Sequence, residues 1–122
     1  MLSKFKIGAN EWIVGDRTNP GNQNELGVCV YAQNTILLDT ICEGDHVSEI
    51  SRESTYWHEV IHAILYSMGM NDLTKDETFV QTLSVFIRQH SEQVTQQKLD
   101  EYHEHLITEY GPNFNRLQKT PG

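Results

Sequence analysis

The pattern of hydrophobic and polar residues divides the chain into a β-rich first part and a helical remainder. Up to residue 40, short runs of β-branched and aromatic residues predict strands at KFKIG, at EWIVG and twice within VCVYAQNTILLDT. The last two runs flank the polar residues Gln33 and Asn34, which predicts a hairpin. The intervening segment DRTNPGNQNELG is dense in Asn, Gly and Pro and is expected to be a loop. TILLDT is expected to be the last strand.

From residue 51 onward, apolar residues recur at helical spacing. A first helix is expected to begin with Ser51 or Ser54 as its N-cap and to end before Gly69. A second is expected to begin around Thr74, and a third, more polar helix to cover about residues 91–110. The predicted buried positions of the first two helices are Trp57, Val60, Ile61, Ile64, Leu65 and Met68, then Phe79, Val80, Leu83, Phe86 and Ile87.

These elements predict an α+β fold. One domain is expected over 1–122, with a core of about 1–90 followed by a C-terminal helix and a loosely ordered tail of about 91–122. Strands come first along the chain and helices follow, which is the order typical of an α+β domain.

Composition narrows the functions that this chain can have. The formal net charge is −8, and an acidic surface repels phosphate backbones, so a nucleic-acid partner is not expected. No apolar run reaches the roughly 20 residues that span a bilayer, and the N-terminus lacks the apolar core of a signal peptide. We therefore expect no membrane association and a cytoplasmic location. Cys29 and Cys42 are the only cysteines and are expected to be free thiols; the oligomeric state is left open.

The segment HEVIH places three titratable side chains on the most apolar predicted helix. His58 and His62 are four residues apart, so both imidazoles lie on one face and can bind one zinc ion. Glu59 is rotated by about 100° from His58, beside the metal, where a general base for hydrolysis belongs. The alternative is a helix whose histidines reach the surface or pair internally. Because polar groups on an apolar helix cost free energy unless something satisfies them, the metal is favoured.

A zinc site needs a third protein ligand. The pattern HExxHxxGxxH is excluded because Leu65 and Met68 occupy its last two positions. The remaining candidates are Asp76, Glu77 and His90, which lie on or near the second predicted helix.

The sequence does not choose among these three candidates by spacing alone. Glu77 could instead form a capping box with Thr74 and bond the backbone of its own helix. Asp76 lies nearer the middle of the apolar stripe and is a direct rival. His90 is 13 residues after Glu77, about 20 Å along a straight helix, so both cannot bind one metal.

HEVIHAILYSMG followed by DETFVQTLSVFI resembles the small zincin-like metallopeptidases of the gluzincin type. The resemblance is to compact proteins of phages and mobile elements, and more distantly to the ImmA/IrrE peptidases. It implies that Glu77 is the third ligand, because the positions of an E-x-x-A-N-x-F-A-like helix are matched here by Glu77, Val80, Gln81, Leu83 and Ser84. It also implies a minimal zincin-like fold: a small N-terminal antiparallel sheet or hairpin, an active-site helix, a glutamate helix and a C-terminal helix.

The chain departs from that family at two points. Larger gluzincins often carry an aspartate where this chain has Gln81, and no equivalent of their transition-state-stabilising residue is assignable. His103, His105 and Tyr110 could supply it if the third helix packs across the site; otherwise they belong to a solvated helix face.

The expected function is a zinc-dependent peptidase acting on a peptide or protein. Its substrate would pair with an edge strand near residues 35–40, and Glu59 would activate the attacking water. The alternative is a zinc-stabilised binding module on the same scaffold with weak or no catalysis. A metal-free helical adaptor is a third possibility. The sequence does not identify a substrate.

Overall fold

The fold is taken from a computed structural model that describes residues 1–18 and 25–110, with side chains up to Thr108. The centre of the expected loop, 19–24, and the expected tail, 111–122, lie outside the described residues. The fold class is α+β, as predicted. The chain divides into two compact units, Met1–Arg88 and Gln89–Gly122.

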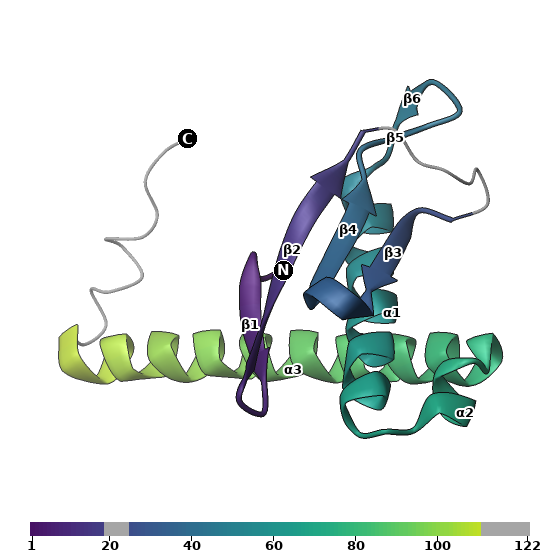
Figure 1. The fold of residues 1–122 in the computed structure, drawn as a ribbon. Coiled ribbons are helices and arrows are strands. Elements are labelled where there is room, and N and C mark those ends of the chain that lie inside the picture. The colour runs from purple at the N-terminus through teal and green to yellow at the C-terminus, as the bar shows by residue number, and fades with distance from the viewer. Residues whose placement is uncertain (19–24, 111–122) are drawn as a thin grey trace. The chain divides into compact units, whose positions relative to one another are not determined.

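The N-terminal strands form one four-stranded sheet with the order β1-β2-β4-β3 (Figure 1). Its strands are β1 (Lys4–Ile7), β2 (Asn10–Arg17), β3 (Gly27–Val30) and β4 (Thr35–Asp39). β2 pairs with β4 in parallel, whereas the other two pairs are antiparallel. The sheet is therefore mixed rather than wholly antiparallel, and β3 is one of its edges.

The predicted hairpin is confirmed as β3 and β4. A 3₁₀ turn over Tyr31–Gln33 joins the two strands, and Asn34 closes it in the left-handed conformation, with φ of 47°. Asparagine tolerates this region better than most residues, so the polar centre of the segment does form the turn. The prediction that TILLDT is the last strand is wrong, since a small ribbon of β5 (Ile41–Cys42) and β6 (Asp45–His46) follows.

Helix α1 (Glu49–Ser67) begins earlier than predicted. Its N-cap is Ser48, whose side chain accepts a hydrogen bond from the backbone N–H of Ser51 at 3.2 Å. Neither Ser51 nor Ser54 caps the helix, because both already lie inside it. The C-terminus follows the prediction: Gly69 has φ of +74°, and the N–H groups of Gly69 and Met70 return to the carbonyls of Tyr66 and Leu65.

A short helix, α2, lies between α1 and the long helix α3. Helix α2 (Asn71–Thr74) is a single turn, and α3 (Glu77–Tyr110) has 34 residues. The second and third predicted helices are therefore one continuous helix. The segment between them, Arg-Gln-His-Ser at 88–91, contains no glycine or proline that would end a helix, and only its change in polarity suggested a break.

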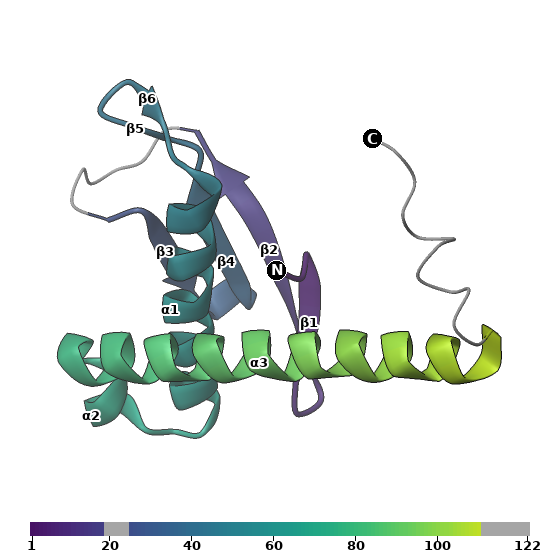
Figure 2. The same ribbon diagram turned by 180° about the vertical axis from the view of Figure 1, so that it is seen from behind.

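The core of the first unit lies on both sides of α1. One cluster fills the space between α1 and the sheet: Trp12, Ile36, Leu38, Tyr56, Val60 and Ala63. A second joins α1 to the start of α3 through Ile61, Leu65 and Val80. Figure 2 shows α1 lying along one face of the sheet. Contrary to prediction, Met68, Phe79, Phe86 and Ile87 are exposed. Tyr56 and Ala63, which were not among the predicted core positions, are buried.

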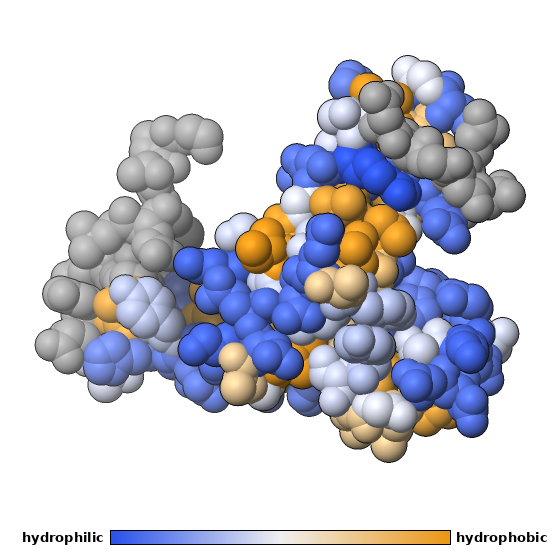
Figure 3. Space-filling view, viewed as in Figure 1, coloured by the Kyte–Doolittle hydropathy of each residue, from blue (hydrophilic) through white to orange (hydrophobic). Residues whose placement is uncertain are grey.

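The opposite face of the sheet is partly apolar. Neighbouring strand residues point to opposite faces, so Ile13 projects away from its buried neighbour Trp12 and is 53% exposed. Figure 3 shows apolar surface over the sheet on this side. Among the described residues, no helix has both the length and the apolar character needed to cross a membrane.

Candidate metal centre

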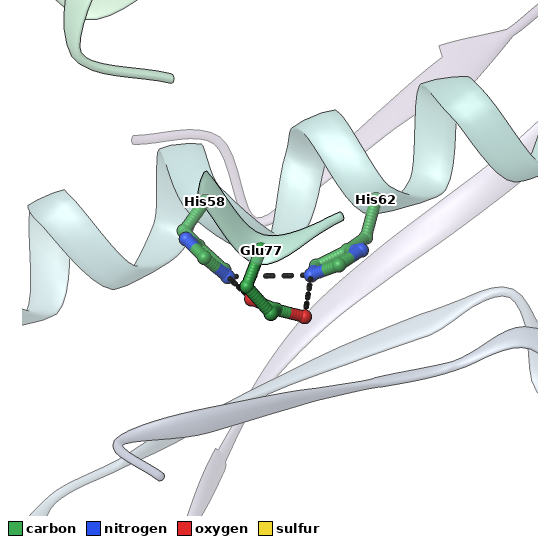
Figure 4. A group of neighbouring side chains, drawn as sticks. All are labelled: His58, His62 and Glu77. Carbon is green, nitrogen blue, oxygen red and sulfur yellow. Dashed lines mark hydrogen bonds and ion pairs between the residues drawn. The ribbon is translucent and has the colours of Figure 1, made fainter. Parts of the chain in front are cut away.

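His58, His62 and Glu77 come together at one point (Figure 4). The Nε2 atoms of the two histidines are 3.2 Å apart. Glu77 reaches them with one carboxylate oxygen each, Oε2 at 2.9 Å from His58 Nε2 and Oε1 at 3.2 Å from His62 Nε2. The structure thus brings together the two histidines of the HEVIH segment and the glutamate that the resemblance implied.

This donor set fits zinc. Ligand atoms about 2.0–2.1 Å from a tetrahedral zinc ion lie about 3.3–3.4 Å from one another. The separations between the three side chains, 2.9 to 3.2 Å, are close to that value. Two imidazoles and one carboxylate also leave a fourth position open, as catalytic zinc sites do and closed structural sites do not.

Helix α1 presents the two histidines from a well-packed position. They are one turn apart on the helix, and the residues between and after them, Val60, Ile61 and Ala63, are buried in the core. His62 is 7% exposed and His58 is half-buried. Because the helix is packed on both sides, its histidines have little freedom to move.

The chain reversal after α1 brings Glu77 back to the histidines. Gly69 ends α1 in a conformation that favours glycine, and nothing lies within 4 Å of where its Cβ would be, so the backbone angle alone requires this residue. The single turn of α2 then leads to α3, which begins at Glu77. Glu77 is therefore the first residue of its helix.

Of the candidates for a third ligand, the structure brings Glu77 to the two histidines. The Asp76 carboxylate accepts a hydrogen bond from the N–H of Phe79 at 3.1 Å, so Asp76 caps α3 and the rival assignment to the metal is not met. The capping box between Thr74 and Glu77 is not formed, because Thr74 contacts His62 and Glu77 contacts both histidines. Among the described residues, the group of side chains that could hold a metal ion does not include His90.

The outer nitrogen of each histidine also has a partner. His58 Nδ1 lies 2.7 Å from Gln81 Oε1, and His62 Nδ1 lies 2.8 Å from Thr74 Oγ1. When Nδ1 donates a proton to such an acceptor, Nε2 keeps its lone pair for a metal. Gln81 thus supplies an acceptor where larger gluzincins carry aspartate. Its spacing from Glu77, one helical turn, is visible in the sequence, whereas the role of Thr74 was missed because it depends on the chain reversal.

Burial shifts the pKa values of two side chains of the site, Glu59 and His62. It raises the pKa of the Glu59 carboxyl to about 7; the charges of Glu77 and Glu25 act in the same direction, whereas His58 and Arg17 oppose it. Burial also lowers the pKa of His62, against the effect of the Glu77 carboxylate. A neutral imidazole is the form that binds a metal, so this second shift favours ligation.

The three side chains line an open cleft of about 910 Å³. One wall is formed by residues 25–29 and Tyr31, and the other by α1, α2 and the start of α3. Glu59 also lines it, next to His58. The edge strand beside the cleft is β3, whereas β4, at residues 35–39, is paired on both sides. The prediction that a substrate would pair with the strand near residues 35–40 is therefore wrong, because that strand has no free edge.

The three residues considered for transition-state stabilisation lie in the second unit. His103 and His105 are on α3, and Tyr110 is its last residue, with a side chain outside the described part. The residues that line the cleft belong to the first unit. A catalytic role for His103, His105 or Tyr110 stays a prediction.

Comparison with known protein families, with curated proteins and with solved structures finds no match for this chain. Functional assignment therefore rests on the chemistry and geometry of the site.

Proposed function

We propose that this protein is a zinc-dependent metallopeptidase of the gluzincin type, which hydrolyses peptide bonds. One observation carries the proposal: two histidine Nε2 atoms and the Glu77 carboxylate converge inside an open cleft that Glu59 also lines. The donor set suits zinc, the cleft gives access to it, and a carboxylate stands beside it.

Each side chain of the site has a separate role in the proposed hydrolysis. His58, His62 and Glu77 hold the metal. When bound, zinc supplies Lewis-acid polarisation of the scissile carbonyl and makes the attacking water more acidic. Glu59 accepts the proton of that water as general base and returns it to the nitrogen of the leaving amine. Gln81 keeps the imidazole of His58 in the orientation that ligation requires.

The substrate is an extended segment of a peptide or protein. β3 pairs with β4 along one edge, and no other described strand pairs with it. A peptide can therefore add to the outer edge of β3 by backbone hydrogen bonds and bring its carbonyl into the cleft. The net charge of −8 disfavours nucleic acid as a partner, and a membrane partner is not proposed. The proposed location is the cytoplasm, that of the host if a phage encodes the chain.

A zinc-stabilised binding module is the second candidate. The observation that favours it is that the ligands come from two helices, α1 and α3, whose contact includes only a small apolar cluster. A metal bridging them contributes folding free energy without any catalysis. Glu59 distinguishes the two candidates, because a purely structural site has no use for a carboxylate beside the metal.

Glu59→Gln tests the proposal. The chain is purified without chelator, its zinc content is measured, and cleavage of unstructured protein substrates is followed. Because Glu59 acts on the water and not on the metal, the variant is expected to keep one zinc per chain and to lose about 10²–10⁴-fold in kcat. Glu53→Gln, the same change on the same helix outside the site, is the matched control and is expected to cleave normally.

The outcomes separate the two candidates. Zinc content near zero in the parent chain overturns both. Full zinc content with no cleavage by the parent, or cleavage unaffected by Glu59→Gln, overturns the peptidase and favours the binding module. If the variant binds substrate without cutting it, it also serves as a trap for identifying that substrate.

A further inference from the structure

The hydroxyl of Thr74 lies between a metal ligand and the wall of the cleft. Its Oγ1 is 2.8 Å from His62 Nδ1 and 3.4 Å from the hydroxyl oxygen of Tyr31. Thr74 is the last residue of α2, and its own N–H donates to the carbonyl of Met70 at 3.1 Å. Tyr31 directly follows the edge strand β3 and is stacked on Tyr66, with ring centroids 4.4 Å apart.

The Thr74 hydroxyl can accept the proton that His62 Nδ1 must carry when Nε2 binds a metal. For His62 Nε2 to face a metal with its lone pair, Nδ1 must carry the proton and donate it to Thr74 Oγ1. The hydroxyls of Thr74 and Tyr31 are also in hydrogen-bonding contact, in which either oxygen can be the donor. Burial raises the pKa of Tyr31, so this residue remains a neutral phenol, and its ring is held by Tyr66. The Thr74 hydroxyl is thus held between the imidazole of His62 and the phenol of Tyr31.

We propose that Thr74 is the positioning residue of His62, and that Tyr31 in turn fixes the hydroxyl of Thr74. The proposal rests on the metal site proposed above and concerns metal affinity rather than turnover. The sequence gives no sign of it, because Tyr31, His62 and Thr74 come from three separate elements. Tyr31 and Thr74 therefore act on the metal only through His62.

The zinc affinity of the full-length protein tests the roles of these two hydrogen bonds. Thr74→Val keeps the shape of the side chain and removes the hydroxyl. Loss of such a partner typically weakens metal binding about 10–100-fold. Because the Thr74 hydroxyl is a neutral partner and not a charged one, we expect the low end, about tenfold. Thr74→Ser restores the hydroxyl and is expected to bind zinc within about twofold of the parent.

Two further variants complete the set. Tyr31→Phe keeps the ring on Tyr66 and removes only the hydroxyl that contacts Thr74, so a smaller loss of about threefold is expected. Thr78→Val makes the same chemical change at an exposed position of α3 and is expected to bind zinc as the parent does. Affinities are measured by competition with a chelator of known zinc affinity, and thermal unfolding of the metal-free chains shows whether each variant folds.

A spectroscopic readout distinguishes positioning from mere packing. In the metal-free chain, the ¹⁵N chemical shifts of the His62 ring report which nitrogen carries the proton. The Glu77 carboxylate favours a proton on Nε2 in every variant, and only the Thr74 hydroxyl favours one on Nδ1. We therefore expect a larger population of the Nδ1–H tautomer in the parent and in Thr74→Ser than in Thr74→Val. Unchanged tautomer populations, or equal zinc affinity of the Thr74→Val variant and the parent, overturn the proposal. A parent that binds zinc but cleaves nothing overturns the peptidase alone, since these affinities are measured without substrate.

Discussion

Asp39 is a fully buried carboxylate at the end of the inner strand β4. It accepts two hydrogen bonds from the guanidinium of Arg17, from Nε at 2.6 Å and from Nη2 at 3.2 Å. This bidentate geometry is the strongest form of such a pair, and it joins the ends of the two parallel strands β2 and β4. Removing one partner leaves the other charge without compensation in a poorly hydrated place.

Asp39→Ala is therefore expected to lower the free energy of unfolding by about 3 kcal/mol, measured by urea denaturation in the presence of a chelator. Asp16→Ala is the matched control, because Asp16 pairs with Arg52 but its side chain is 58% exposed. Exposed pairs contribute little, so the control is expected to lose less than about 1 kcal/mol. Equal losses in the two variants would show that burial does not decide the strength of the Arg17–Asp39 pair.

The thiol of Cys29 is expected to react slowly. It lines the cleft, and burial, assisted by the charge of Glu59, raises its pKa to about 12. Since the thiolate is the reactive form, alkylation at pH 8 is expected to be at least about 10²-fold slower than for an ordinary thiol of pKa about 8.5. The rate is expected to rise about tenfold per pH unit up to the pKa. A Cys42→Ser background isolates the signal, and a rate that levels off below pH 10 would contradict the prediction.

At the scale of single residues, the sequence predicted the proximity of those candidate ligands that lie on one helix. His58 and His62 are neighbours on any α-helix, so their convergence follows from their spacing. Glu77 was placed by resemblance and not by spacing, because nothing in the spacing distinguishes it from Asp76. The hydrogen bond between Thr74 and His62 required the exact path of the chain through Gly69 and α2, which no local pattern specifies.

At the scale of elements, the start of α1 offers a direct test. Ser48 accepts a hydrogen bond from the N–H of Ser51, so Ser48→Ala leaves that donor without its partner and is expected to cost about 1 kcal/mol of unfolding free energy. Ser54→Ala, inside the helix, is expected to change stability by less than about 0.5 kcal/mol. Thermal or urea denaturation measures both. The reverse order of effects would place the N-cap where the sequence pattern suggested it.

Element type proved more predictable than element pairing or length. The β3–β4 hairpin followed from its turn residues, because an antiparallel neighbour is a local consequence of the turn. The parallel pairing of β2 with β4 joins strands separated by β3 and the segment before it, and local pattern contains no information about it. The sequence predicted two helices in place of α3 because the polarity of the residues changes near position 90. A change in polarity does not end a helix when no helix-breaking residue is present.

At the scale of the whole molecule, the fold and the candidate site lie in the first unit. Both core clusters, the proposed metal ligands and the residues lining the cleft come from Met1–Arg88. A chain ending at Arg88 is therefore expected to unfold cooperatively and to bind zinc with the affinity of the full-length chain. Circular dichroism during urea denaturation and chelator competition measure the two properties. Loss of either would show that the second unit is part of the folding core.

Cleavage by the same shortened chain decides what the second unit contributes to the proposed reaction. If residues 1–88 contain the complete catalytic site, kcat/KM falls by less than about threefold, which is under 1 kcal/mol of transition-state stabilisation. The matched comparison is the full-length chain with His103→Ala, His105→Ala and Tyr110→Phe, which removes two imidazoles and one phenolic hydroxyl but keeps the helix. A fall of about 10²-fold or more in both proteins, with zinc still bound, would assign transition-state stabilisation to those side chains. A fall in the shortened chain alone would instead mean that the helix itself, not those groups, supports substrate binding.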